Sequence, residues 1–370
     1  MIAALRSFGD RLLGRGEGSI TIPIFDGALK PNQILETADV VASFDDASDI
    51  ATDGKTLFVA DGVQVLRVAD AERTEAARFD RPVTALCVLP DGGLAVALGG
   101  QKILVKGGAA DGRSWTGVAG VPFHAANAIA CRPDGTLVVT DGSSRHDCAG
   151  WARDLMDRGT SGRLVLLDPR TGDAKEAARG LEYAFGACAS DAETLVSESW
   201  RHRVLAIGPD GKRRVVLGRL PVYPSRLVAA AGGGFWLTAF AARTQLVEFV
   251  LRESAFRRRM IKEIAPEHWI APRLRSGESY LEPMQGAHLR TMGVLKPWAP
   301  PRSYGLAIRL SPEGIPLYSL HSRVDGIHHG IVAAAEVAGA LYLLAKGPGR
   351  LLRIALADIE LADIDKDIAA

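Results

Sequence analysis

The stretch PDGTLVVTD, at residues 133–141, decides the fold. It joins a turn sequence of Pro, Asp and Gly to a short run of apolar, mostly β-branched residues, which is typical of a strand that follows a tight turn. The pattern recurs five more times, at DGKTLFVAD (53–61), DGGLAVAL (91–98), DAETLVSES (191–199), AGGGFWLTAF (231–240) and VAGALYLLAK (337–346). Such recurrence indicates a repeat architecture.

A second strand sequence follows these repeats, so the repeating unit is built from β-hairpins. The second strands are VQVLRVA (from 63), QKILVKG (from 101), GRLVLLDP (from 162), HRVLAIGPDGKRRVVL (from 202), TQLVEFVL (from 244) and GRLLRIAL (from 349). Equivalent positions lie 37 residues apart from Leu57 to Leu94, and 43 apart from Leu94 to Leu137. This spacing is typical of a four-stranded propeller blade, so the six repeats predict an all-β, six-bladed β-propeller.

Two intervals between repeats are longer than one blade and must contain insertions. The first insertion, at residues 146–162, is predicted to be a loop with a short helix. The second lies before the last blade and combines a basic helix at 252–264 with a Pro-rich stretch at 265–305. Long ordered loops in compact domains are often binding loops or lids. Decoration of the blade without a function is the alternative.

Closure of the ring requires the two ends of the chain to share a blade, because an open propeller would expose a strand edge. The strand sequence QILETADVVASF, at 33–44, is therefore expected to complete the sixth blade. This organisation predicts an amphipathic N-terminal segment at 1–19, a propeller domain at 20–358 with its insertion at 252–303, and a C-terminal tail at 359–370.

Composition excludes several classes of protein. With 47% hydrophobic and 24% charged residues, the 370-residue chain is neither disordered, nor collagen-like, nor a coiled coil. Lys and Arg number 44 against 43 Asp and Glu, so the concentrated positive charge that attracts nucleic acid is not expected. We therefore do not expect the protein to bind nucleic acid. The sequence does not indicate an oligomeric state.

Targeting signals are not expected in this sequence. The N-terminal sequence MIAALRSFGDRLLGR is amphipathic and lacks the apolar run of a secretory leader or a transmembrane segment. We expect it to dock on the protein's own surface, with binding to a membrane surface as the alternative. The cysteines form no CxxC pair, which favours small buried side chains over zinc or disulfide roles. These features predict a cytoplasmic protein.

A longer part of the sequence resembles a known family. The segments GTSGRLVLLDPRTGDAKEAARGLEYAFGACAS (159–190), LVSESWRHRVLAI (195–207), RLPVYPSRL (219–227) and GGFWLTAF (233–240) resemble the strictosidine synthase-like proteins and their adipocyte plasma membrane-associated relatives, within the superfamily of gluconolactonases and paraoxonases. The resemblance extends over residues 45–356. It implies a small-molecule site on one face of a central channel. Gluconolactonase and paraoxonase relatives hold a divalent cation there and open lactones or esters, whereas plant strictosidine synthases use a glutamate.

The resemblance also locates the channel residues of this chain. The family's acidic metal ligand falls on Ser48, its channel asparagine is kept as Asn127, a second asparagine is replaced by Phe185, and an Asp-Asn pair is replaced by Ser225 and Arg226. Calcium takes six to eight oxygen ligands, so these replacements predict no metal site, and we expect no other cofactor. No nucleotide-binding glycine motif and no GxSxG motif is present.

The plant enzymes' catalytic residues are not kept in this chain. Their glutamate falls on Val332 and the neighbouring histidine on Gly330, so strictosidine formation is not expected. A guanidinium at Arg226 would stand where relatives hold a cation, and it is suited to bind a carboxylate or to stabilise an oxyanion. Pairing of Arg226 with a structural carboxylate is the alternative.

Histidines are the natural candidates for proton transfer near neutral pH. His146 follows the third repeat, and His328 and His329 precede the sixth, so all three are expected to converge at one mouth of the channel. Purely structural hydrogen bonding is the alternative for each. Trp298 and Tyr304, in or beside the long insertion, are expected to supply an apolar wall of the substrate site.

Together these inferences predict a small-molecule enzyme that hydrolyses a lactone or ester-like bond without a metal ion. The substrate would be anionic or carbonyl-bearing, with Arg226 stabilising charge, Asn127 orienting the substrate and one of the histidines moving the proton. One alternative is a metal-independent lyase or condensing enzyme that uses the same histidines. Another is a non-catalytic ligand-binding propeller.

Overall fold

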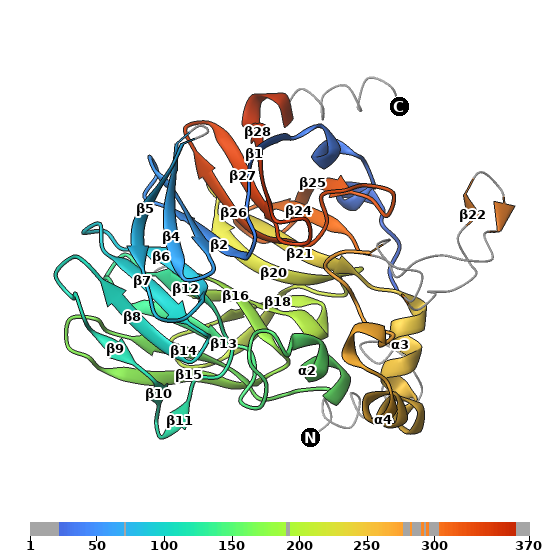
Figure 1. The fold of residues 1–370 in the computed structure, drawn as a ribbon, viewed down its shortest axis with the longest axis horizontal. Coiled ribbons are helices and arrows are strands. Elements are labelled where there is room, and N and C mark those ends of the chain that lie inside the picture. Colours follow the sequence, from blue (N-terminus) through green and yellow to red (C-terminus); the bar gives the residue numbers. More distant parts are fainter. Residues whose placement is uncertain are drawn as a thin grey trace.

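The chain forms six four-stranded antiparallel sheets. Figure 1 shows how they are arranged around a common axis. The computed structural model describes residues 22–69, 72–189, 193–276, 282, 290–291, 294–295 and 303–359. The predicted six-bladed β-propeller is confirmed. The amphipathic segment predicted at 1–19 and nearly all of the predicted tail lie outside the described residues.

Each blade is an antiparallel sheet whose strands follow one another from the axis to the rim. Blade 1 is β2 (Ala47–Thr52), β3 (Leu57–Asp61), β4 (Gln64–Ala69) and β5 (Glu72–Arg78); blade 2 is β6 (Val83–Val88), β7 (Leu94–Leu98), β8 (Lys102–Lys106) and β9 (Ser114–Trp115). Blade 3 is β12 (Ala126–Cys131), β13 (Leu137–Asp141), β14 (Gly162–Leu167) and β15 (Ala174–Leu181); blade 4 is β16 (Ala184–Ala189), β17 (Thr194–Glu198), β18 (Arg203–Ile207) and β19 (Arg213–Leu217). Blade 5 is β20 (Val222–Ala229), β21 (Phe235–Ala242), β24 (Gly305–Leu310) and β25 (Pro316–Ser322); blade 6 is β26 (Ile331–Val337), β27 (Ala340–Ala345), β28 (Arg350–Ala355) and β1 (Asp39–Ser43).

The ring closes in blade 6, where strands from both ends of the chain meet. β1 pairs antiparallel with β28, with Asp39 opposite Arg353 and Ser43 opposite Arg350. The predicted completion of the sixth blade is thus confirmed. The beginning of the predicted strand is instead the short 3-10 helix η3 (Ile34–Thr37), which buries Leu35.

The two insertions place helices beside the blades. The predicted short helix is α2 (Trp151–Asp157), between β13 and β14. The predicted basic helix is α4 (Ser254–Glu263), between β21 and β24 of blade 5. Among the described residues no helix has the length and hydrophobicity to span a membrane.

One predicted strand is wrong, because residues 245–252 form helix α3 (Gln245–Arg252). The Thr244 side chain caps this helix by accepting a hydrogen bond from the backbone N–H of Val247. Val247 and Val250 are buried while Phe249 is 52% exposed, which is the one-sided burial of a helix on a protein surface. The third strand of blade 5 is β24 instead.

Apolar side chains fill the spaces between adjacent blades. One cluster joins Ile103 and Trp115 of blade 2 to Leu137 and Val165 of blade 3. Such burial of apolar surface, at roughly 25 cal/mol per Å², is the main force that holds blades together, because neighbouring blades share no strand.

The six innermost strands share a backbone irregularity that creates the central channel. In each of them the pairing with the second strand shifts near the first residues of the strand, as in a β-bulge. The residues that fall in these bulges are Ser48, Thr84, Asn127, Phe185 with Gly186, Ser225 with Arg226, and Val332. A Cβ atom on Gly186 would lie 2.5 Å from the Arg226 Cα, so only glycine lets β16 and β20 approach this closely.

Candidate functional site in the central channel

Arg226 crosses the axis of the propeller from blade 5. Its Nη1 donates to the carbonyl oxygens of Ser48 (3.1 Å) and Val332 (3.3 Å). Its Nη2 donates to those of Thr84 (2.8 Å) and Asn127 (2.6 Å). The four acceptors are bulge carbonyls from blades 1, 6, 2 and 3, so a single side chain is tied to four other blades.

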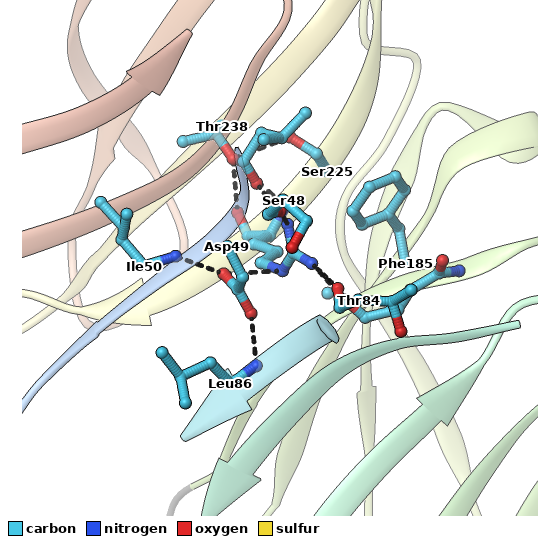
Figure 2. Close-up of polar contacts among 12 residues, drawn as sticks. Ser48, Asp49, Ile50, Thr84, Leu86, Phe185, Ser225 and Thr238 are labelled. Carbon is cyan, nitrogen blue, oxygen red and sulfur yellow. Dashed lines mark hydrogen bonds and ion pairs between the residues drawn. The ribbon is translucent and has the colours of Figure 1, made fainter. Parts of the chain in front are cut away.

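Asp49 and Phe185 complete the surroundings of the guanidinium. Nε lies 3.1 Å from Asp49 Oδ1, which is an ion-pair distance, although the contact lacks hydrogen-bond geometry. The Asp49 carboxylate also accepts hydrogen bonds from the backbone N–H groups of Ile50 and Leu86, both at 2.9 Å, as Figure 2 shows. The Phe185 ring lies 5.3 Å from the guanidinium carbon, within reach of a cation–π contact. We call Arg226, Asp49 and the four carbonyls the axial hub.

Burial governs the charge state of the axial hub. It raises the pKa of the Asp49 carboxyl to about 6, although the Arg226 charge and the two backbone hydrogen bonds act to lower it. The Arg226 side chain is 7% exposed, and all four hydrogens on its terminal nitrogens have protein acceptors. The role predicted for Arg226 as a ligand clamp is therefore corrected: its terminal nitrogens are saturated by backbone carbonyls, and its Nε faces a structural carboxylate.

The axial hub does not fit a hard divalent cation. The carbonyl oxygens that would face a metal ion on the axis already accept hydrogen bonds from Arg226. Asp49 is the carboxylate of the hub, and calcium takes six to eight oxygen ligands. Within the described part of the chain, no three His, Cys, Asp or Glu side chains gather in a way that would bind a metal.

A cavity of about 490 Å³ opens on the axial hub. Its lining residues are Asp46, Ser48, Pro82, Val83, Thr84, Gly99, Asn127, Asp147, Cys148, Ala149, Trp151, Tyr183, Phe185, Arg226, Phe240, Leu274, Val332 and Lys346. Most come from the inner strands and the residues before them, with Gly99 after β7, Phe240 on β21 and Lys346 after β27. Trp151 belongs to α2 in the first insertion, and Leu274 follows α4 in the second. Both insertions therefore contribute to the wall of the cavity, which supports the interpretation of these loops as functional.

Aromatic side chains make one wall of the cavity. Phe240 stacks on Phe185 at a ring distance of 5.8 Å and meets Trp151 edge to face at 5.3 Å. Tyr183 lies 6.1 Å from Phe185. Such a wall favours the apolar part of a ligand. Phe185 was predicted, whereas the other three were missed.

The predicted roof residues lie elsewhere. Tyr304 is buried between β24 and the N-terminal part of the chain, stacked on Phe25, and its hydroxyl lies 2.9 Å from His321 Nδ1. Its predicted place in the substrate site is therefore wrong, because Tyr304 is committed to packing within blade 5. Trp298 lies outside the described residues.

Two of the three predicted polar channel residues line the cavity. Ser48 donates its hydroxyl to the Val83 carbonyl, and Asn127 Nδ2 donates to the Ala184 carbonyl at 3.1 Å. Ser225 is fully buried, with its hydroxyl 2.7 Å from that of Thr238, and is not part of the lining. Its predicted contact with substrate is corrected for this reason.

The predicted convergence of three histidines is not found. His146 Nε2 lies 2.9 Å from Asp157 Oδ2 at the end of α2. His329 is held between Ser303 Oγ (2.5 Å) and the Arg323 carbonyl (2.6 Å), and His328 is buried beside it. None of the three lines the cavity: His146 and His329 are held by hydrogen bonds elsewhere, and His328 is buried beside His329. Burial lowers the pKa of both His328 and His329.

Lys346 is the basic residue of the cavity that sequence reasoning missed. It follows the last residue of β27 and is partly buried. Burial lowers its pKa; the nearby charge of Asp46 raises it, and that of Arg226 lowers it further. The signal in the sequence was the basic residue that ends the repeat at 337–346, where the repeats at 53–61 and 133–141 end in aspartate.

Comparisons with known proteins agree with this architecture. No family model matches the chain. The curated protein strictosidine synthase-like 13 of Arabidopsis thaliana is 27% identical over 168 residues, which cover 44% of this chain and 38% of that protein. This match confirms the resemblance seen in the sequence, and it spans less than half of the relative.

Solved structures match over most of the chain. A gluconolactonase from Xanthomonas campestris has a TM-score of 0.52 at 13% identity, with 87% of each chain covered. A calcium-binding protein, regucalcin, from Agrobacterium tumefaciens has a TM-score of 0.51 at 10% identity, covering 86% of this chain and 93% of that one. The chain is thus a six-bladed β-propeller with the fold of these two proteins and a partial sequence similarity to a strictosidine synthase-like protein.

Proposed function

We propose that the chain is a small-molecule enzyme that hydrolyses a lactone or ester-like bond in the channel cavity without a metal ion. The observation that carries this proposal is a cavity of about 490 Å³, with aromatic walls, that opens on a guanidinium where a hard cation does not fit. This volume is typical of sites for small ligands. The names of the relatives, a gluconolactonase and a strictosidine synthase-like protein, support an enzyme that acts on small molecules.

The polar residues of the cavity suggest a division of roles. Asn127 and Ser48, next to the axial hub, orient a carbonyl-bearing substrate. The Lys346 ammonium takes over the part first expected of Arg226, since it faces the cavity and is suited to a carboxylate or to a developing oxyanion. Asp46, which also lines the cavity, is the acceptor for a proton from the attacking water.

Hydrolysis of a panel of lactones and aryl esters, with and without EDTA, tests the proposal. We expect turnover that EDTA leaves unchanged. A variant that fills the cavity, Leu274→Trp, should abolish turnover, whereas Leu317→Trp, at a position that is 50% exposed on β25, should not. Loss of activity on chelation would contradict the metal-free mechanism.

Two other outcomes would replace the proposal. If esters and lactones are not turned over but aldehydes are consumed, the chain is a lyase or condensing enzyme. If ligands raise the unfolding temperature and nothing is turned over, it is a binding propeller. In both cases Leu274→Trp should remove the effect of the ligand, because the cavity remains the site.

A further inference from the structure

The backbone around Lys346 is fixed, although its side chain lines a cavity. The Lys346 N–H donates to the Gly330 carbonyl at 2.9 Å, and its own carbonyl accepts from the Gly349 N–H at 3.3 Å. The first bond joins the turn after β27 to the segment that precedes β26, and the second closes the turn itself. The amine therefore extends from a rigid base into the same space as Trp151, Phe240 and Leu274.

The amine of Lys346 is a basic group without a partner. Within the described part of the chain, no hydrogen bond or ion pair holds its Nζ. The charged and titratable groups that act on it are Asp46 and Asp49 of blade 1, Arg226 of blade 5 and Cys148 of the first insertion. Burial lowers the pKa of Lys346, so a larger share of it is neutral near pH 7 to 8 than of a surface lysine.

We propose that the Lys346 amine is a nucleophile that forms a Schiff base with an aldehyde or ketone bound in the cavity. The nitrogen attacks the carbonyl carbon and a C–N bond forms. The carbonyl oxygen leaves as water with two protons, one from the amine and one from solvent. A protonated imine remains, and no oxidant or reductant is needed.

The surroundings of the amine suit this step. The aromatic wall formed by Trp151, Phe185 and Phe240 binds an apolar carbonyl compound and keeps it beside the nitrogen. Arg226, fixed in the axial hub, keeps a permanent positive charge near the amine that favours its neutral form. The cavity therefore selects an aldehyde or ketone with an apolar or aromatic body.

This inference rests on the proposed function in one respect, namely that the cavity is the ligand site. Hydrolysis and Schiff-base formation can fail independently. If Lys346 forms an imine and no lactone is hydrolysed, the proposed hydrolysis fails and the inference stands. If lactones are hydrolysed and Lys346 forms no imine, the inference fails and the proposed hydrolysis stands.

Reductive trapping tests the inference on the full chain. The protein is incubated with benzaldehyde and sodium cyanoborohydride near pH 7, and labelled lysines are located by peptide mass spectrometry. We expect about tenfold or more label on Lys346 than on Lys212, whose side chain is 89% exposed. The excess should shrink as the pH is raised toward 10, because the surface lysines then also become neutral.

Matched variants separate reactivity from folding. Lys346→Arg keeps the positive charge but cannot form an imine, so its label should be lost while Lys212→Arg keeps the label on Lys346. Leu274→Trp should reduce labelling by filling the cavity. Equal labelling of Lys346 and Lys212 in the wild-type protein would overturn the inference, and that comparison needs no variant to fold.

Discussion

Two positive side chains share the central channel and differ in what surrounds them. Arg226 donates to four backbone carbonyls and faces a carboxylate, whereas Lys346 lines the adjoining cavity without a partner among the described residues. The satisfied cation holds the blades together. The unsatisfied one, which gains little from the fold, is the one suited to chemistry on a ligand.

The difference follows from where each side chain lies in the propeller: on the axis, among the bulge carbonyls, or in the adjoining cavity. The bulges bring main-chain acceptors to the axis, and a guanidinium with four hydrogens on its terminal nitrogens can satisfy four of them. Lys346 lies just outside this ring, in the turn after β27, and the second insertion supplies the apolar Leu274 to the wall beside it. Substitutions in the hub and in the cavity should therefore have different effects on stability.

Removal of Arg226 should have the largest effect. Arg226→Ala leaves Asp49 without its ion-pair partner and four carbonyls without their donor, so we expect a loss of about 3–5 kcal/mol in the free energy of unfolding. Urea denaturation measures this loss. Arg226→Lys should recover part of it, because an ammonium keeps the charge but cannot reach all four acceptors. A loss below about 1 kcal/mol would show that the axial hub does not hold the ring.

The Asp49 carboxyl should make stability depend on pH in a defined window. Burial raises its pKa in the folded state to about 6, above the value near 3.8 in the unfolded chain. Protonation of Asp49 therefore stabilises the folded state fully below pH 3.8, and this stabilisation is lost as the pH rises through about 6. Relative to Asp49→Asn, the wild-type protein should lose up to about 3 kcal/mol between pH 4 and pH 6. Urea denaturation at several pH values tests this. A difference that is flat across the window contradicts it.

Phe185 should contribute less than the polar groups of the hub. Phe185→Leu removes the ring that faces the guanidinium and enlarges the cavity, and we expect a loss of about 1–2 kcal/mol. The control is Phe249→Leu on the exposed side of α3, which should change stability by less than about 0.5 kcal/mol. Equal losses of unfolding free energy in the two variants would show that the Phe185 ring does not stabilise the axial hub.

Lys346 should matter least for stability. We expect the free energy of unfolding of Lys346→Met to stay within about 0.5 kcal/mol of the wild-type value, because no ion pair is broken. Thermal and urea denaturation check this. If the variant loses as much stability as Arg226→Ala does, Lys346 also has a structural role, and the contrast drawn between the two side chains is wrong.

The blades could be predicted from the sequence because a turn followed by an alternating strand recurs at a nearly constant spacing. The helix α3 could not, since the short apolar run LVEFVL fits a strand as well as one face of a helix. Its end caps decide the matter, with Thr244 at the N-terminus. The bulges of the inner strands also leave no local signal, because they depend on pairing with the next strand.

The site could be predicted only in part. The resemblance led to Ser48, Asn127, Phe185 and Arg226, which do line the cavity. It did not show that the terminal nitrogens of Arg226 are saturated, because their acceptors are backbone groups that any sequence carries. The histidines were misplaced since the order of segments does not give the direction of a side chain. Lys346 was missed because the cavity that it lines is formed with residues of two insertions far away in the chain.

The carbonyl ring on the axis has a consequence for how the channel can change. Its acceptors are main-chain atoms at four of the six bulges, so point substitutions at those positions replace the side chain and leave the oxygen in place. The ring of carbonyl oxygens is thus a property of the backbone, whereas the positively charged group that binds to it can be exchanged by substitution. In this chain that group is the guanidinium of Arg226. A substitution at this one position would therefore change the electrostatic potential that a ligand in the cavity experiences.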